Sequence, residues 1–184
     1  MEPIEQLDTL IPTFSGLAGQ VTAGDLERPT PCTGWQVRDL LNHIAGGAPV
    51  FAGLFRGEEA GPFPDEDQLG DDPSGAVRAA LGEFDAAVRS SGAMERTLAT
   101  PFGEMPGEAF ARLAAFDLMV HSWDLATALG QQLELEDELV EEVDAFARSA
   151  VPAERPPEMF APKVEPQSGA TRLECLVAFS GRRP

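Results

Sequence analysis

The sequence predicts an all-α fold, an up-down four-helix bundle with additional short helices at its C-terminal end. Three observations predict this fold. Apolar residues recur at spacings of three and four along several long segments. Residues that cap helix ends flank most of these segments. No segment shows the apolar–polar alternation of a half-buried strand. At 184 residues, the chain has the length of one well-packed domain covering residues 1–184.

The first two predicted helices begin near the N-terminus. Apolar residues spaced along 4–21 predict the first helix, and Pro12 lies inside that pattern and is expected to kink or divide it. Thr33 and Gln36 have the spacing of a capping box, which predicts the start of the second helix. The buried stripe of that helix is expected to run through residues 37–55.

The middle of the chain is predicted to contain two surface loops and a third helix. Residues 56–72 are acidic and rich in glycine and proline, which indicates the first loop. Asp72 as the N-cap, with Pro73 at the first helical position, starts a third helix whose inner face lies within 77–88. Glycine and proline residues in 101–107 then predict a second loop.

The C-terminal half contributes the fourth principal helix and the additional pieces. The fourth helix is predicted from about 108 to 129, where Gly130 ends it. A fifth, shorter helix is expected over 136–150, followed by a proline-rich stretch, 152–166. The apolar tail 173–179 is expected to dock back onto the domain.

Charge and cysteine content limit the function and the compartment. The chain has 31 acidic and 13 basic residues, a formal net charge of −18, which argues against binding to nucleic acid or to anionic membranes. No secretory signal and no membrane-spanning apolar run is visible. Cys32 and Cys175 form no CxxC pair, so two free thiols in a reducing cytoplasm are expected, with a disulfide between them as the alternative.

The fourth predicted helix carries polar side chains on an apolar stripe. Asp117, His121 and Asp124 share this stripe with Phe110 and Leu113. Burying an ionised carboxylate and an imidazole there would cost several kcal/mol unless they were paired or bound to a metal. Asp117 and His121 are four positions apart, so both side chains can reach one point, as two metal ligands on one helix do.

The chain has two histidines, and the other one, His43, lies at the edge of the stripe of the second helix. Asp39 and His43 repeat the Asp-x-x-x-His spacing of Asp117 and His121. If the two helices pack as neighbours, His43, Asp117 and His121 would converge. Two imidazoles and one carboxylate leave coordination positions open, which is typical of a catalytic metal site.

Other roles for these residues remain open at this point. Asp117 and His121 could form a structural hydrogen-bonded pair without any metal. Asp124 is expected to orient the second ring nitrogen of His121, with helix capping or an ion pair with an arginine as the alternative. Asp39 could do the same for His43, with the same alternatives.

Two sequence blocks resemble the DinB/YfiT-like metalloenzyme superfamily. The first block, residues 30–43, reads TPCTGWQVRDLLNH, and the second, residues 116–126, reads FDLMVHSWDLA. Residues 100–103 and the ending 173–184 fit the same pattern. More narrowly, the chain is similar to the actinobacterial branch related to the N-terminal, metal-binding domain of mycothiol-dependent maleylpyruvate isomerase.

The resemblance implies a DinB-like four-helix bundle that binds a divalent metal at one end, with zinc expected and nickel as the alternative. It implies that the histidine of the first block, His43, and the acidic residue and histidine of the second, Asp117 and His121, are the ligands. It also implies a low-molecular-weight thiol cofactor such as mycothiol, bacillithiol or glutathione. A thiol bound to a divalent cation loses its proton and becomes a nucleophile at neutral pH.

The sequence departs from the isomerase in two respects. Asp117 stands where the isomerase has glutamate, and the shorter carboxylate would pull the ion toward the fourth helix or weaken the site. The isomerase also has an additional C-terminal domain that contributes to its active site, and this sequence ends without one. Both departures argue against maleylpyruvate isomerisation as the reaction.

We therefore expect a metal-dependent enzyme that acts with a low-molecular-weight thiol, of the thiol S-transferase or thiol-assisted isomerase type. Its expected partners are the thiol and an electrophilic small molecule, and a homodimer is left open. The alternative is a non-catalytic metal- or ligand-binding bundle, such as a sensor or a stress-response accessory protein.

Overall fold

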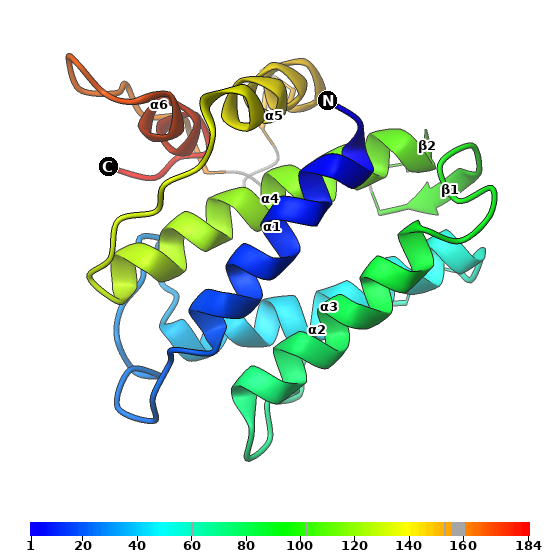
Figure 1. Ribbon diagram of the computed structural model, residues 1–184, viewed down its shortest axis with the longest axis horizontal. Helices are drawn as coiled ribbons and strands as arrows, with labels where there is room; N and C mark the ends of the chain where they lie inside the picture. The colour runs from blue at the N-terminus through cyan, green and yellow to red at the C-terminus, as the bar shows by residue number, and fades with distance from the viewer. Residues whose placement is uncertain (60, 102, 153, 156–160) are drawn as a thin grey trace.

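Helices dominate the structure, as the apolar spacing predicts (Figure 1). The computed structural model describes residues 1–59, 61–101, 103–152, 154–155 and 161–184. The elements are α1 (Pro3–Ala18), α2 (Val37–Arg56), α3 (Pro73–Val88), β1 (Thr97–Thr100), β2 (Gly103–Pro106), α4 (Gly107–Ala128), α5 (Asp137–Ala150) and α6 (Arg172–Phe179). The all-α prediction is confirmed. Among the described helices, none is both long and apolar enough to cross a membrane.

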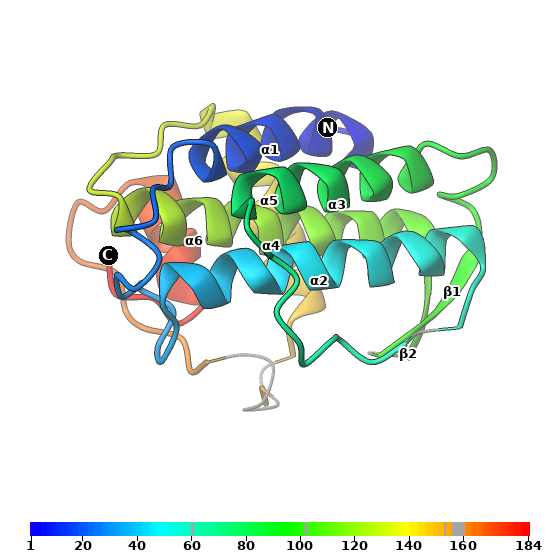
Figure 2. The ribbon, with the colours of Figure 1, turned by 90° about the horizontal axis from the view of Figure 1, so that it is seen from below.

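The first four helices form a closed ring around the core. Helix α1 packs against α3 and α4, and α2 also packs against α3 and α4. Their apolar faces meet in one buried cluster that includes Phe14, Leu41, Phe84 and Phe110. Helices α1 and α4 run in one direction, and α2 and α3 run in the opposite direction (Figures 1 and 2). The directions thus follow the order up, down, down, up rather than strict alternation, because a long connection returns the chain between α2 and α3.

This connection packs across α2 (Figure 2). We call its residues 61–69 the strap. A Cβ atom added at Gly46 would lie 2.8 Å from Cγ of Pro64, and one added at Gly47 would lie 2.5 Å from Cε1 of Phe63. Both distances are shorter than a van der Waals contact, so the two glycines allow the strap to approach the helix closely. The predicted surface loop is confirmed, since its described residues, apart from the first, form no helix or strand and most are exposed, and Phe63 and Pro64 pack it closely against α2.

The start of α2 differs from the prediction. Trp35 donates its backbone N–H to the carbonyl of Cys32 at 3.0 Å, so Thr33 lies inside a turn and is not the N-cap. The helix instead begins after Gln36, whose backbone N–H donates to the carboxylate of Asp39 at 2.8 Å. The capping box is thus formed three residues later than the Thr33 pattern indicates.

Two further expectations are corrected near the other helices. Pro12 does not divide the first helix, since α1 is continuous from Pro3 to Ala18. The segment before α4, predicted as a loop, contains an antiparallel hairpin in which Leu98 of β1 pairs with Met105 of β2. Each strand has four residues, which is too short for an alternating pattern to stand out beside the proline and glycine residues.

The remaining predicted helix ends are confirmed. The Asp72 carboxylate caps α3 by accepting the N–H of Gly75 at 2.9 Å. Gly130 follows α4 with a left-handed φ of 73°. The apolar tail forms α6, which packs against α5 and α4. Phe102 and part of the proline-rich stretch 152–166 lie outside the described residues.

Candidate metal centre

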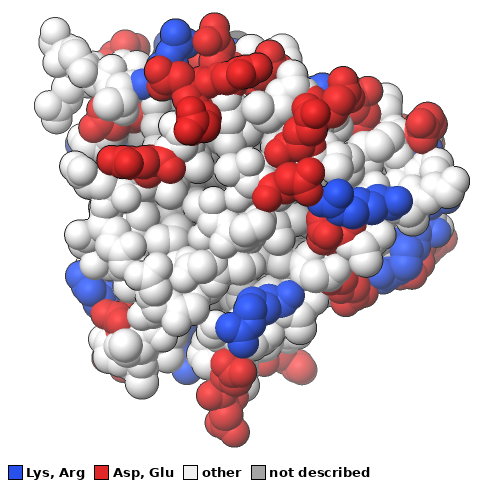
Figure 3. Space-filling view, in the orientation of Figure 1, with Lys and Arg blue, Asp and Glu red and all other residues white. Residues whose placement is uncertain are grey.

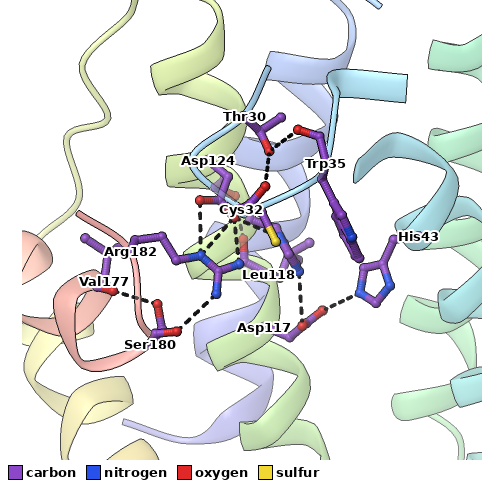
Figure 4. Close-up of polar contacts among 12 residues, drawn as sticks. Thr30, Cys32, Trp35, His43, Asp117, Leu118, Asp124, Val177, Ser180 and Arg182 are labelled. Carbon is purple, nitrogen blue, oxygen red and sulfur yellow. Dashed lines mark hydrogen bonds and ion pairs between the residues drawn. The ribbon is translucent and has the colours of Figure 1, made fainter. Parts of the chain in front are cut away.

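The predicted ligands of the second and fourth helices converge at one point. His43 comes from α2, and Asp117 and His121 come from adjacent turns of α4 (Figure 4). Nε2 of His43 lies 3.5 Å from one oxygen of Asp117, and Nε2 of His121 lies 3.4 Å from the other. One ligand atom from each residue lies within 4.8 Å of the other two. The packing of α2 against α4 thus brings together all three candidate ligands.

The separations between Asp117 and the two imidazoles are longer than those of a tight ion pair. A charged N–H that donates to a carboxylate usually lies about 2.7–2.9 Å from the oxygen. Two donors that each lie about 2.1 Å from one tetrahedral ion are about 3.4 Å apart. The 3.4 and 3.5 Å distances run from the two imidazoles to different oxygens of Asp117, and the three ligand atoms lie within 4.8 Å of one another, so one ion could be held between them. Two imidazoles and a carboxylate are also ligands that zinc and nickel accept.

Asp124 and Arg182 lie on the side of His121 that faces away from Asp117. Nδ1 of His121 lies 3.0 Å from Oδ2 of Asp124, whose side chain has no exposed surface. Arg182, which follows α6, donates to the same carboxylate through Nη2 at 2.8 Å and through Nε at 3.2 Å (Figure 4). The hydrogen bond to Asp124 leaves Nε2 of His121 facing Asp117, as a metal-binding histidine requires.

Aromatic rings hold both histidines in place. The indole of Trp35 stacks on the His121 ring with centroids 5.5 Å apart and an angle of 7° between the planes. Phe63 of the strap stacks on His43 with centroids 5.7 Å apart and an angle of 5°. Stacked rings restrict rotation about χ2, so both imidazoles are oriented before any ligand binds.

The charges at the site stabilise one another. Burial raises the pKa of Asp117, but the imidazoles of His121 and His43 lower it by more, so the pKa lies well below its usual range. Burial lowers the pKa of His121, but Asp117 and Asp124 raise it by more, to about 9. The metal-free site therefore holds a protonated His121 between two carboxylates at neutral pH.

The pair behind the site is also charged. Burial raises the pKa of Asp124, but His121 and Arg182 lower it below its ordinary value. Burial lowers the pKa of Arg182, and its contacts with Asp124 raise it above the ordinary value. Both side chains are therefore ionised, and each neutralises the other inside the protein.

Asp39 occupies a different position from the other candidates. Its exposed carboxylate accepts the backbone N–H of Gln36 and caps α2. Within the described part of the chain, the structure shows no contact between Asp39 and His43. The i, i+4 spacing places both residues on one side of the helix, but Asp39 instead accepts the backbone N–H of the N-cap residue Gln36.

Sequence reasoning missed Arg182 as a partner of the site. An ion pair between Asp124 and some arginine was one alternative, and Arg182 belongs to the ending that carries the family resemblance. The sequence contained no signal that chose Arg182 over Arg183, because the two are adjacent and lie 58 and 59 positions from Asp124. The docking of α6 makes that choice.

Comparisons with known proteins match a family model and two relatives to this chain. The family model described as the mycothiol maleylpyruvate isomerase N-terminal domain matches residues 7–126. Two uncharacterised proteins of Mycobacterium tuberculosis, from strains CDC 1551 and H37Rv, are each 33% identical over 184 residues. Each match covers 99% of this chain and 98% of the relative.

Two solved structures share the fold. The crystal structure of the mycothiol-dependent maleylpyruvate isomerase matches with a TM-score of 0.57 and 18% identity, over 67% of this chain and 59% of that chain. A histidine-to-alanine variant of that enzyme matches with a TM-score of 0.62 and 17% identity, over 78% of this chain and 66% of the variant. The DinB-like helical fold is confirmed, and the chain belongs to the mycothiol maleylpyruvate isomerase N-terminal domain family.

Proposed function

We propose that this protein is a divalent-metal-dependent enzyme that uses a low-molecular-weight thiol, such as mycothiol, to attack an electrophilic small molecule. The convergence of His43, Asp117 and His121 carries the proposal. Family membership supports the thiol, because the solved relative is by name a mycothiol-dependent isomerase. The reaction is of the thiol S-transfer or thiol-assisted isomerisation type.

Three residues of this chain would bind the ion, and two others orient one of these ligands. His43, Asp117 and His121 would hold the ion, and zinc is the metal that we expect. The ion would lower the pKa of a bound thiol and supply a thiolate at neutral pH. Asp124 accepts a hydrogen bond from Nδ1–H of His121, and the Nε2 atom of His121 is thereby left to bind the ion. Arg182 holds the Asp124 carboxylate in this orientation.

A cobalt-substituted protein tests whether a thiol reaches the ion. Adding mycothiol to the cobalt(II) form is expected to produce a sulfur-to-cobalt charge-transfer absorption that saturates at one thiol per chain. The S-methyl derivative of the same thiol has no ionisable proton and serves as the matched control, with no such absorption expected. A cobalt-loaded protein that shows no spectral response to the thiol would instead favour a metal-binding protein without thiol chemistry.

Metal binding is expected to release a proton from His121. At about pH 7, well below the pKa of about 9, the metal-free imidazole is protonated, and an ion binds only the neutral ring. We expect about one proton released from His121 per zinc ion at this pH, and fewer as the pH rises through 9. The apparent affinity for zinc should rise roughly tenfold per pH unit below that value.

Calorimetric titration with zinc in buffers of different ionisation enthalpy measures this proton count. The same titration at about pH 10 is the control, since His121 is already neutral above its pKa of about 9. Proton release that does not change between the two pH values would contradict the assigned role of His121.

A further inference from the structure

A cleft opens directly beside two of the candidate ligands. It lies between α2, α3, α4 and the strap, encloses about 30 Å³ and is otherwise open to solvent. His43 and Asp117 form its polar edge. The rest of its lining is Ile44, Gly47, Ala48, Phe51, Phe63, Leu81, Phe84, Ala114 and Leu118. Apart from the two candidate ligands, every one of these residues is apolar.

The described lining of the cleft contains no positively charged lysine or arginine side chain that could bind an acidic ligand. Arg182 is held by Asp124 behind His121, and Arg38 at the N-terminal end of α2 pairs with Asp67 of the strap at 2.8 Å. A carboxylate held against the apolar part of the lining, away from the ion, would lose its water shell and gain no side chain of opposite charge.

The net charge of the protein also disfavours an anionic ligand. The formal net charge is −18, and acidic side chains gather over α5 on the face drawn in Figure 3. The net charge therefore opposes the approach of a dianionic substrate. Neutral ligands are not affected by this field.

Phe63 forms the wall between the cleft and solvent. Its ring stacks on His43 and meets the edge of Phe51, with centroids 5.7 Å apart in each case. With 38% of its surface exposed, Phe63 is the exposed large hydrophobic residue of the described chain. Gly47 leaves the space that this ring occupies. An apolar side chain at the mouth of a cleft is well placed to cover an apolar ligand.

We propose that this cleft binds an uncharged apolar group, a phenyl ring or a branched alkyl chain, of the electrophile that reacts at the metal centre. This inference rests on the proposed function and specifies its substrate class. Phe51, Phe63 and Phe84 contact the apolar group, while the electrophilic atom lies toward His43 and Asp117. A small dicarboxylate is disfavoured, because with one end at the ion its second carboxylate would lie against this apolar lining.

Zinc-binding hydroxamates of matched structure test the proposal on the zinc-loaded protein. Acetohydroxamate reports binding at the metal alone, benzohydroxamate adds a phenyl ring, and 4-carboxybenzohydroxamate adds a charge to that ring. We expect benzohydroxamate to bind about tenfold tighter than either of the others, because only its ring buries apolar surface without burying a charge. Calorimetry gives each dissociation constant, and metal analysis gives the zinc content.

Variants of the strap localise the effect. Phe63→Ala is expected to remove most of the tenfold preference. The preference is the ratio of two dissociation constants measured on the same zinc-loaded variant, so any change at the metal from the lost stacking on His43 affects both constants and cancels. Phe63→Leu keeps an apolar wall and should retain most of the preference. Asp65→Ala, an exposed position on the same strap, is the control and should behave as the wild type.

The outcomes separate this inference from the proposed function. Equal affinity for acetohydroxamate and benzohydroxamate, at one zinc per chain, would overturn the inference and leave the metal site standing. Tight binding of the carboxylated ring would also overturn it. A protein that holds no zinc and binds no hydroxamate would overturn the proposed function, and the inference with it.

Discussion

Replacing either histidine with alanine is expected to abolish metal binding. His43→Ala and His121→Ala each leave one imidazole and the Asp117 carboxylate, and two ligands hold a divalent ion weakly. The wild type should contain about one divalent ion per chain after incubation with zinc, as expected of a three-ligand site with open positions. We expect both variants to contain almost none after desalting. Because the ligands come from two helices, loss in both variants would show that α2 and α4 build one site.

Mass spectrometry of metal content measures this result directly, and thermal unfolding supports it. Zinc should raise the Tm of the wild type but not of the two variants, because a ligand stabilises only a protein that binds it. Asp71→Asn removes an exposed carboxylate that is not a candidate ligand, and it controls for non-specific binding of zinc to this acidic protein. A wild type without zinc, with variants that are merely less stable, would mean that the histidines are structural.

The second large effect is expected at Arg182. Arg182→Leu should lower the free energy of unfolding by about 2 kcal/mol or more, because the buried Asp124 carboxylate loses its arginine partner and keeps the charged His121, which it shares with Asp117. The side chain of Asp124 has no exposed surface, and that of Arg182 is 14% exposed, so water cannot replace the lost contact. Denaturant unfolding of the metal-free protein measures the change.

Two matched variants separate the ion pair from other effects. Arg183→Leu removes the adjacent, exposed arginine and should change stability little. In the double variant Asp124→Leu with Arg182→Leu, no unpaired charge stays buried, so much of the lost stability should return. Its zinc affinity should still be roughly 10- to 100-fold lower, because His121 lacks the acid that orients it. Equal stability of the Arg182 and Arg183 variants would contradict the ion-pair argument.

The apolar spacing predicted where the helices lie, because each helix must bury one stripe along its length. Asp72 and Gly130 mark helix ends through local backbone requirements, and the structure confirms both positions. The sequence also identifies the candidate ligands. Asp117 and His121 share a helix face by spacing alone, and the chain offers only His43 as a second imidazole.

Two predictions of local structure were wrong. Thr33 has capping chemistry, but the turn from Cys32 to Trp35 moves the start of α2 to the next suitable pair. The glycine and proline residues predict a loop where β1 and β2 form a hairpin, because backbone pairing between strands leaves little trace in so few residues.

Sequence by itself determined the class of fold, the helix that carries Asp117 and His121, and the donor types of the candidate site. Tertiary structure decided that α2 and α3 run in the same direction, which requires a strap and places Phe63 on His43. It also decided that Arg182, from the end of the chain, neutralises Asp124. The physical reason is range: caps and helical stripes depend on neighbours within a few turns, whereas packing pairs residues far apart in the chain.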